Sequence, residues 1–171
     1  LLNEFIRRSD RVRIACIAQL VNVIAPIRAE KGGPAWRQTI YYPYQFASLY
    51  GRGDALNVAV DAPTYDCSVA DDVCYLDVAG VHDKAAGTLT LFVLNRHLTE
   101  TADLDVSLTG FGSPSLAEHL SMEGYGLNDT NGPDKPDNVV PGKGTGVGVE
   151  DGQLKGKLAP LSYHVLRLSV G

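Results

Sequence analysis

The sequence is poor in several features that mark whole classes of protein. It has 15 basic against 20 acidic side chains, a net charge of −5, and no basic stripe suited to nucleic acid. No apolar run is long enough to cross a bilayer. Residues 1–13 mix acidic and basic side chains and lack the layout of a signal peptide. We therefore expect neither nucleic acid nor a membrane as a partner.

Cysteine and histidine are also scarce, and neither is spaced for a metal site. The cysteines are Cys16, Cys67 and Cys74, and an odd count outside any metal-ligand spacing favours reduced thiols in a cytoplasmic protein. We expect small buried side chains, with a disulfide between Cys67 and Cys74 as the alternative. The four histidines also lack metal-ligand spacing. No metal and no cofactor is expected.

Residues 1–52 have the pattern of an α/β structure. Val12–Ala18 is almost continuously apolar, which is typical of a strand buried on both faces of a parallel sheet. Helical spacing precedes it in Leu1–Ser9, and a second helix is predicted around Tyr42–Leu49, before Gly51. Two helices cannot bury both faces of a lone parallel strand. This segment is therefore predicted to be part of a larger α/β domain.

From Asp54 onward apolar residues alternate with polar ones, which predicts strands with one buried face. The predicted strands include Leu56–Val60, Leu104–Leu108, a central strand Thr88–Asn95 and a last strand Leu161–Val170. Asp151-Gly152 follows two alternating valines, and this pair is typical of a two-residue hairpin turn. The pattern predicts a mainly β fold with an antiparallel β-sandwich over residues 53–171.

Four motifs resemble those of a known enzyme family. They are Asp10–Pro26 (DRVRIACIAQLVNVIAP), Trp36–Pro43 (WRQTIYYP), Tyr50–Gly53 (YGRG) and Leu158–Leu168 (LAPLSYHVLRL). Their residues and order are similar to those of family-51 α-L-arabinofuranosidases, and the first motif is long and specific. The resemblance implies a (β/α)8 barrel followed by a jelly-roll-like β-sandwich. Residues 1–52 would then be the end of helix seven, strand eight and helix eight of the barrel, and residues 53–171 the sandwich.

Two residues are candidate substrate contacts: Gln19, which the resemblance implies, and Trp36, for its aromatic ring in the loop after the same strand. Gln19 directly follows the predicted strand Val12–Ala18, and active sites of such barrels lie at the carboxyl ends of the strands. A neutral amide can donate to and accept from sugar hydroxyls, although it could instead cap the neighbouring loop. Trp36 either stacks on a sugar or packs its loop onto the protein. Asn22 is expected to bind loop backbone rather than sugar.

No catalytic residue is assigned. The family resembled consists of retaining glycosidases, which need a nucleophilic and an acid/base carboxylate about 5 Å apart. The resemblance places both glutamates on earlier barrel strands, so this chain is expected to be inactive alone. The parent enzyme would release terminal arabinofuranosyl groups from arabinan or arabinoxylan oligosaccharides. Its implied partners are the upstream barrel, an arabinose-containing oligosaccharide and further copies of itself.

The alternative is a non-catalytic carbohydrate-binding or oligomerisation module. Carbohydrate-binding modules usually present rows of exposed aromatic rings, whereas this sandwich has no tryptophan and scattered tyrosines: Tyr65, Tyr75, Tyr125 and Tyr163. Asn128–Asn138 (NDTNGPDKPDN) could offer oxygen ligands to calcium, but its prolines and irregular pattern favour a plain surface loop.

Separation from a barrel would leave apolar faces of residues 1–50 uncovered. We expect these residues either to rearrange or to pack against a second copy. If the parent's amino terminus completes the sandwich, as the resemblance implies, one sheet edge would also be open.

Overall fold

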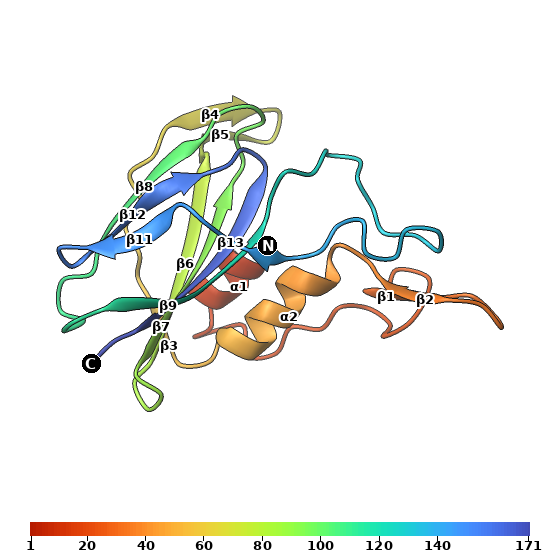
Figure 1. The fold of residues 1–171 in the computed structure, drawn as a ribbon, viewed down its shortest axis with the longest axis horizontal. Helices are drawn as coiled ribbons and strands as arrows, with labels where there is room; N and C mark the ends of the chain where they lie inside the picture. Colours follow the sequence, from red (N-terminus) through yellow and green to blue (C-terminus); the bar gives the residue numbers. More distant parts are fainter.

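The computed structural model describes residues 1–171 as two packed antiparallel sheets with helices on one outer face (Figure 1). The larger sheet has the order β10-β9-β13-β7-β6-β3. Its strands are β3 (Asp54–Leu56), β6 (Leu76–Asp83), β7 (Thr88–Asn95), β9 (Ser115–Met122), β10 (Gly142–Lys143) and β13 (Ser162–Ser169). The smaller sheet, β11-β12-β8, consists of β8 (Ala102–Ser107), β11 (Val147–Glu150) and β12 (Gln153–Leu158). The predicted mainly β, antiparallel sandwich is confirmed.

The other elements lie outside these two sheets (Figure 1). They are the hairpins β1 (Ile27–Ala29)–β2 (Ala35–Arg37) and β4 (Thr64–Cys67)–β5 (Ala70–Cys74), and the helices α1 (Leu2–Arg7) and α2 (Tyr41–Tyr50). Both helices form where the helical spacing predicted them. Neither has the length and apolar character that crossing a membrane would require.

The main core lies between the two sheets. It consists of Val78, Leu89, Leu91, Val93, Leu104, Leu108, Leu154, Leu158, Leu166 and Leu168. Strand β7 lies between β6 and β13, which confirms the central strand predicted over Thr88–Asn95. Leu166 and Leu168 share the inner face of β13, and Val170 packs against the same core, as the alternation predicted.

A second apolar cluster covers the outer face of the larger sheet. Tyr42 and Phe46 of α2 pack there on Phe92 of β7 and Val165 of β13. Because β7 is thus covered on both faces, its sequence is apolar throughout rather than alternating.

The predicted turn at Asp151-Gly152 is confirmed. It joins β11 to β12, with Glu150 paired to Gln153. Asp151 and Gly152 have φ values of 51° and 73°, both in the left-handed region. A two-residue turn with both central residues in this region matches the right-handed twist of the flanking strands.

The strand predicted over Val12–Ala18 is absent from the structure, and that prediction is wrong for this chain. A parallel strand needs neighbours on both sides to bond its backbone, and the chain supplies none. The segment is irregular, and Ile14 is 82% exposed. The hydroxyl of Tyr44 in α2 donates to the carbonyl of Ala15 at 2.5 Å. The segment therefore contacts α2 but has no strand partner. The expectation that residues 1–50 rearrange or pack against a second copy stays a prediction.

Two smaller predictions also need correction. The strand expected over Leu56–Val60 ends at Leu56, although Val58 still packs against the main core. All three cysteines are free, but Cys16 and Cys67 are exposed rather than buried. Cys16 lies in the segment that forms no strand, and Cys67 lies at an irregularity of the β4–β5 hairpin.

An apolar groove of about 520 Å³ opens beside β8. Strand β8 is an edge strand of the smaller sheet, and Leu56, Val58 and Phe111 are among the apolar side chains that line the groove. The sandwich therefore has an open edge next to its core.

Candidate functional site

Gln19 lies on the irregular segment that follows Val12–Ala18. Its side chain is exposed and makes no hydrogen bond within the chain. Gln19 therefore does not cap the neighbouring loop in this structure. Asn22 fills that role instead, because its Oδ1 accepts from the backbone N–H of Ala29 at 2.7 Å. The prediction that Asn22 binds loop backbone is confirmed.

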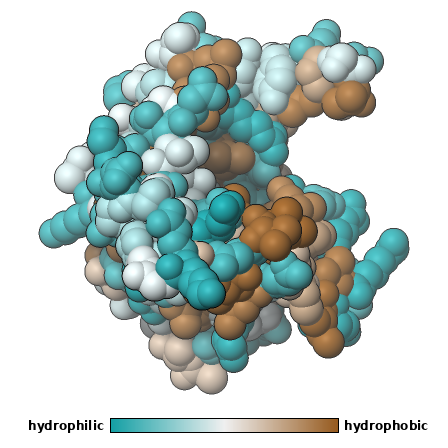
Figure 2. All heavy atoms as spheres, turned by 90° about the vertical axis from the view of Figure 1, so that its right-hand side faces the viewer, coloured by the Kyte–Doolittle hydropathy of each residue, from teal (hydrophilic) through white to brown (hydrophobic).

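The loop after Gln19 is tightly wound and apolar on its surface. Asn22 and Val23 have φ values of 63° and 54°, a conformation that a β-branched valine rarely adopts. Leu20, Val23 and Ile24 are 73%, 69% and 65% exposed. Figure 2 views the side of the molecule on the right in Figure 1 and shows apolar patches among hydrophilic side chains there.

Trp36 lies on strand β2 and is half-buried. It pairs with Arg28 across the β1–β2 hairpin. The base of this hairpin is held by Gln38, whose backbone N–H donates to the carbonyl of Pro26 at 2.7 Å and whose side-chain amide donates to the carbonyl of Ala25. Ala25 is fully buried. The hairpin is therefore a firmly attached support for Trp36.

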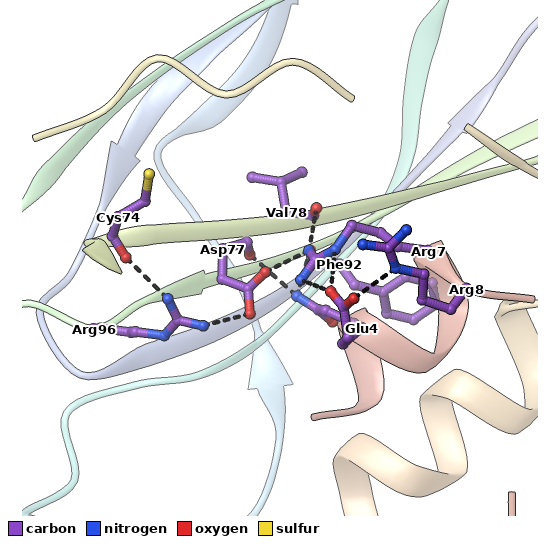
Figure 3. A network of polar contacts seen from close by, with 9 residues as sticks. Glu4, Arg7, Arg8, Cys74, Asp77, Val78, Phe92 and Arg96 are labelled. Carbon is purple, nitrogen blue, oxygen red and sulfur yellow. Dashed lines mark hydrogen bonds and ion pairs between the residues drawn. The ribbon is translucent and has the colours of Figure 1, made fainter. Parts of the chain in front are cut away.

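A buried carboxylate joins α1 to the sandwich (Figure 3). Asp77 of β6 is 7% exposed and accepts from Arg7 at 2.5 Å and from Arg96 at 2.6 Å. Arg7 also donates to the carbonyl of Val78 at 2.8 Å, and Asn3 donates to the carbonyl of Asp77 at 3.1 Å. These contacts fix the helix against the outer face of the larger sheet.

The Asp77 network lacks the features of a glycosidase site. Both carboxylate oxygens of Asp77 are bound by guanidinium groups. The only carboxylate sharing a partner with it is Glu4, whose pKa is lowered by hydrogen bonds from Arg8 and then from Arg7. A general acid needs a raised pKa, and a nucleophile needs an open face toward the sugar. Asp77 and Glu4 are therefore structural.

A second buried polar chain superficially resembles a nucleophilic triad. Ser162 Oγ donates to the carbonyl of Ala159 at 2.5 Å and accepts from His164 Nε2 at 2.8 Å. His164 Nδ1 then accepts from His119 Nε2 at 3.0 Å, and Glu123 lies 3.8 Å from His164. Burial, and then the nearby His119, lowers the pKa of His164 to about 4. Ser162 and His164 are each 1% exposed, so no substrate can reach this hydroxyl.

The tyrosines of the sandwich are less scattered than the sequence suggested. Tyr65 and Tyr75 have ring centroids 4.7 Å apart, and His97 lies 4.5 Å from Tyr75. All three side chains are half-buried and face one another. They attach the β4–β5 hairpin to the sandwich rather than forming an open row of rings.

The comparisons with known proteins decide the family. A family model described as the alpha-L-arabinofuranosidase C-terminal domain matches residues 1–162. The chain belongs to this family. It is 45% identical over 168 residues to the intracellular exo-α-(1→5)-L-arabinofuranosidase 1 of Bacillus subtilis, covering 98% of this chain and 33% of that protein. The corresponding enzyme of Halalkalibacterium halodurans is 44% identical over 168 residues, with the same coverage.

A solved structure gives the same relationship. The family 51 α-L-arabinofuranosidase from Bifidobacterium longum matches with a TM-score of 0.89 and 33% identity over 96% of this chain and 32% of that chain. The resemblance seen in the four motifs is therefore confirmed. The chain spans about a third of the length of these relatives. The part that it matches is the C-terminal domain of this family.

Sequence reasoning missed the two buried polar networks of this C-terminal domain. Asp77 is separated from Arg7 by 70 positions and from Arg96 by 19, so no local pattern links them. The one available signal was an aspartate near the start of a strand, followed directly by the apolar run Val78–Val81. Ser162 and His164, in contrast, share one face of β13 because they are two residues apart.

Proposed function

We propose that this chain belongs to an enzyme that releases terminal α-L-arabinofuranosyl groups from arabinan or arabinoxylan oligosaccharides with retention. The observation that carries the proposal is the family match over residues 1–162. The first two relatives, which align with 98% of the chain, are both named as exo-acting arabinofuranosidases. In such an enzyme this chain supplies the end of the barrel and an accessory sandwich.

The chemistry is assigned to the upstream part of the parent. Retention requires two carboxylates about 5 Å apart, one acting as nucleophile and the other as acid and base. Asp77 and Glu4 are both occupied by arginine side chains. The chain alone is therefore proposed to be inactive, and the upstream barrel is its partner.

Residues 1–52 are proposed to complete that barrel, with residues 53–171 as the separate sandwich. The apolar run Val12–Ala18 would become strand eight once neighbouring strands are available to bond it. Gln19 would then stand at the carboxyl end of that strand, where barrel active sites lie. We assign Gln19 a hydrogen-bonding role toward the bound arabinofuranose. We assign Trp36 a stacking role toward the oligosaccharide.

The location and assembly of the parent are also proposals. The first two relatives are named intracellular, which supports a cytoplasmic enzyme. The exposed apolar side chains around Leu20–Ile24 are compatible with burial against the barrel or against another copy. We therefore retain a homo-oligomer among the proposed partners.

Hydrolysis of p-nitrophenyl α-L-arabinofuranoside tests the function. The chain and a version extended upstream to a complete barrel are assayed side by side. We expect activity only in the extended protein, and a loss of about tenfold or more in kcat/KM on Gln19→Ala because a sugar hydrogen bond is removed. Activity in this chain alone would show that it contains a catalytic pair. An inactive extended protein would refute the proposed substrate.

A further inference from the structure

Segment 124–141, between β9 and β10, has almost no regular structure but is held by many internal hydrogen bonds. The Tyr125 hydroxyl donates to the carbonyl of Val140 at 2.8 Å and so closes the segment at its base. Gly132 and Lys135 exchange two backbone hydrogen bonds of 3.1 Å near its middle. Long irregular loops in compact domains are uncommon and are often functional. This loop was expected to be a plain surface loop, and its order calls for a further reason.

Asn131 is the residue through which this loop reaches the amino-terminal segment. It is 8% exposed, and its Nδ2 donates both to the carbonyl of Val139 and to the carbonyl of Arg37, each at 2.9 Å. Its Oδ1 accepts from the backbone N–H of Val139 at 2.6 Å. Both amide hydrogens and the carbonyl oxygen are therefore used, and the bond to Arg37 joins positions 94 apart in the sequence.

The partner of this bond is the last residue of β2, directly after Trp36. Strand β2 is bonded on one side to β1, where Trp36 lies opposite Arg28. At the end of β2, the side chain of Asn131 in the loop donates to the backbone carbonyl of Arg37. Arg37 also places its guanidinium 5.1 Å from the ring centroid of Tyr41 at the start of α2. The backbone that carries Trp36 is therefore held by β1 on one side and by a loop of the sandwich at its end.

We propose that Asn131 is a positioning residue for the carbohydrate site of the parent arabinofuranosidase. By holding the carbonyl of Arg37, it sets the place of β2 and so of the Trp36 ring on which an arabino-oligosaccharide stacks. The sandwich thereby contributes to substrate binding without touching sugar. This inference rests on the substrate contact proposed for Trp36.

A stacking contact made equally in the ground state and the transition state changes KM and leaves kcat unaltered. Loss of the Asn131 bond is therefore expected to raise KM for arabino-oligosaccharides about fivefold, with kcat unchanged within about twofold. A general loosening of the fold would lower the melting temperature and change both constants.

The test compares Asn131→Asp with Asn138→Ala. The first variant keeps the side-chain shape but removes both N–H donors. The second removes a single bond to Thr130 within the same loop and leaves Arg37 untouched. Trp36 is the only tryptophan of this chain, so acrylamide quenching of its fluorescence reports directly on the position of β2. KM and kcat for arabinotriose are measured in the protein extended to a complete barrel.

We expect Asn131→Asp to raise the quenching constant of Trp36 about twofold and to raise KM, while Asn138→Ala changes neither. Thermal melting confirms that both variants are folded. Unchanged quenching in folded Asn131→Asp would overturn the link between Asn131 and Trp36. Increased quenching with an unchanged KM would overturn the role in sugar binding. An extended wild-type protein without arabinofuranosidase activity would instead refute the proposed function. In that case, quenching of Trp36 in this chain would still decide whether Asn131 positions Trp36.

Discussion

Replacement of Asp77 by asparagine should weaken the attachment of α1 to the sandwich. The carboxylate makes two charge-assisted hydrogen bonds, of 2.5 Å to Arg7 and 2.6 Å to Arg96. Each such bond contributes about 1.5–3 kcal/mol. Both arginine side chains are 31% exposed, so water regains part of their solvation when the carboxylate is lost. Arg7 and Arg96 also keep their bonds to the carbonyls of Val78 and Cys74. We therefore expect a loss of about 3 kcal/mol in the free energy of unfolding.

Urea unfolding measures this loss, and Asp103→Asn is the matched control. Asp103 also forms a 2.5 Å ion pair, with Lys157, but its side chain is 80% exposed and that of Lys157 70% exposed. Exposed pairs contribute little, so the control should unfold at the wild-type urea concentration. Hydrogen exchange should accelerate in α1 of Asp77→Asn before it does in β7. A change below about 0.5 kcal/mol, or equal effects of the two variants, would refute the assignment of Asp77 as the anchor of α1.

Two further predictions concern the buried histidines. Burial lowers the pKa of His119, and burial followed by the nearby His119 lowers that of His164 to about 4. The unfolded chain then binds more protons than the folded one as the pH falls through about 6.5. Stability should therefore decrease by about 2 kcal/mol between pH 7.5 and pH 5 from His164 alone, and His164→Asn should flatten this dependence in urea unfolding; an equally steep wild-type and variant profile would contradict it. Gly144→Ala should lower the melting temperature, because a Cβ would lie 2.3 Å from Nε2 of the buried His119, whereas Gly142→Ala meets nothing within 4 Å and should be neutral. Equal melting temperatures for these two variants would show that the ring can move aside.

Strands whose faces differ in polarity could be predicted from the sequence. The alternation around Leu104–Leu108 placed β8, and the two-residue turn at Asp151-Gly152 placed the β11–β12 hairpin. The central strand β7 was recognised because both of its faces are covered. In each case a local period or turn conformation determines the structure, so neighbouring residues contain the necessary information.

Features that depend on distant partners could not be predicted in this way. The bond from Asn131 to Arg37 links an irregular loop to the end of β2, and the sequence around Asn131 indicated only turns. The salt bridge from Asp77 to Arg7 joins a strand to a residue of α1 that precedes it by 70 positions. In Val12–Ala18 the local pattern does predict a strand, but the chain has no neighbouring strand to form hydrogen bonds with it. Gln19 is a candidate by its motif position and Trp36 by its aromatic ring, and both proposed roles concern a sugar rather than another residue of this chain.

The anchored helices on either side of Val12–Ala18 suggest what the sandwich does for a barrel. Helix α1 is fixed by Asp77, and α2 packs through Tyr42 and Phe46 on the outer face of the larger sheet. The segment between the two helices is therefore held at both ends, although Val12–Ala18 within it has no strand partner. In the proposed barrel, upstream strands would bond Val12–Ala18 while both helices keep their places on the sandwich. Ordering fewer residues costs less conformational entropy, so under the proposed function a sandwich that holds both helices would favour closure of the barrel beside Gln19.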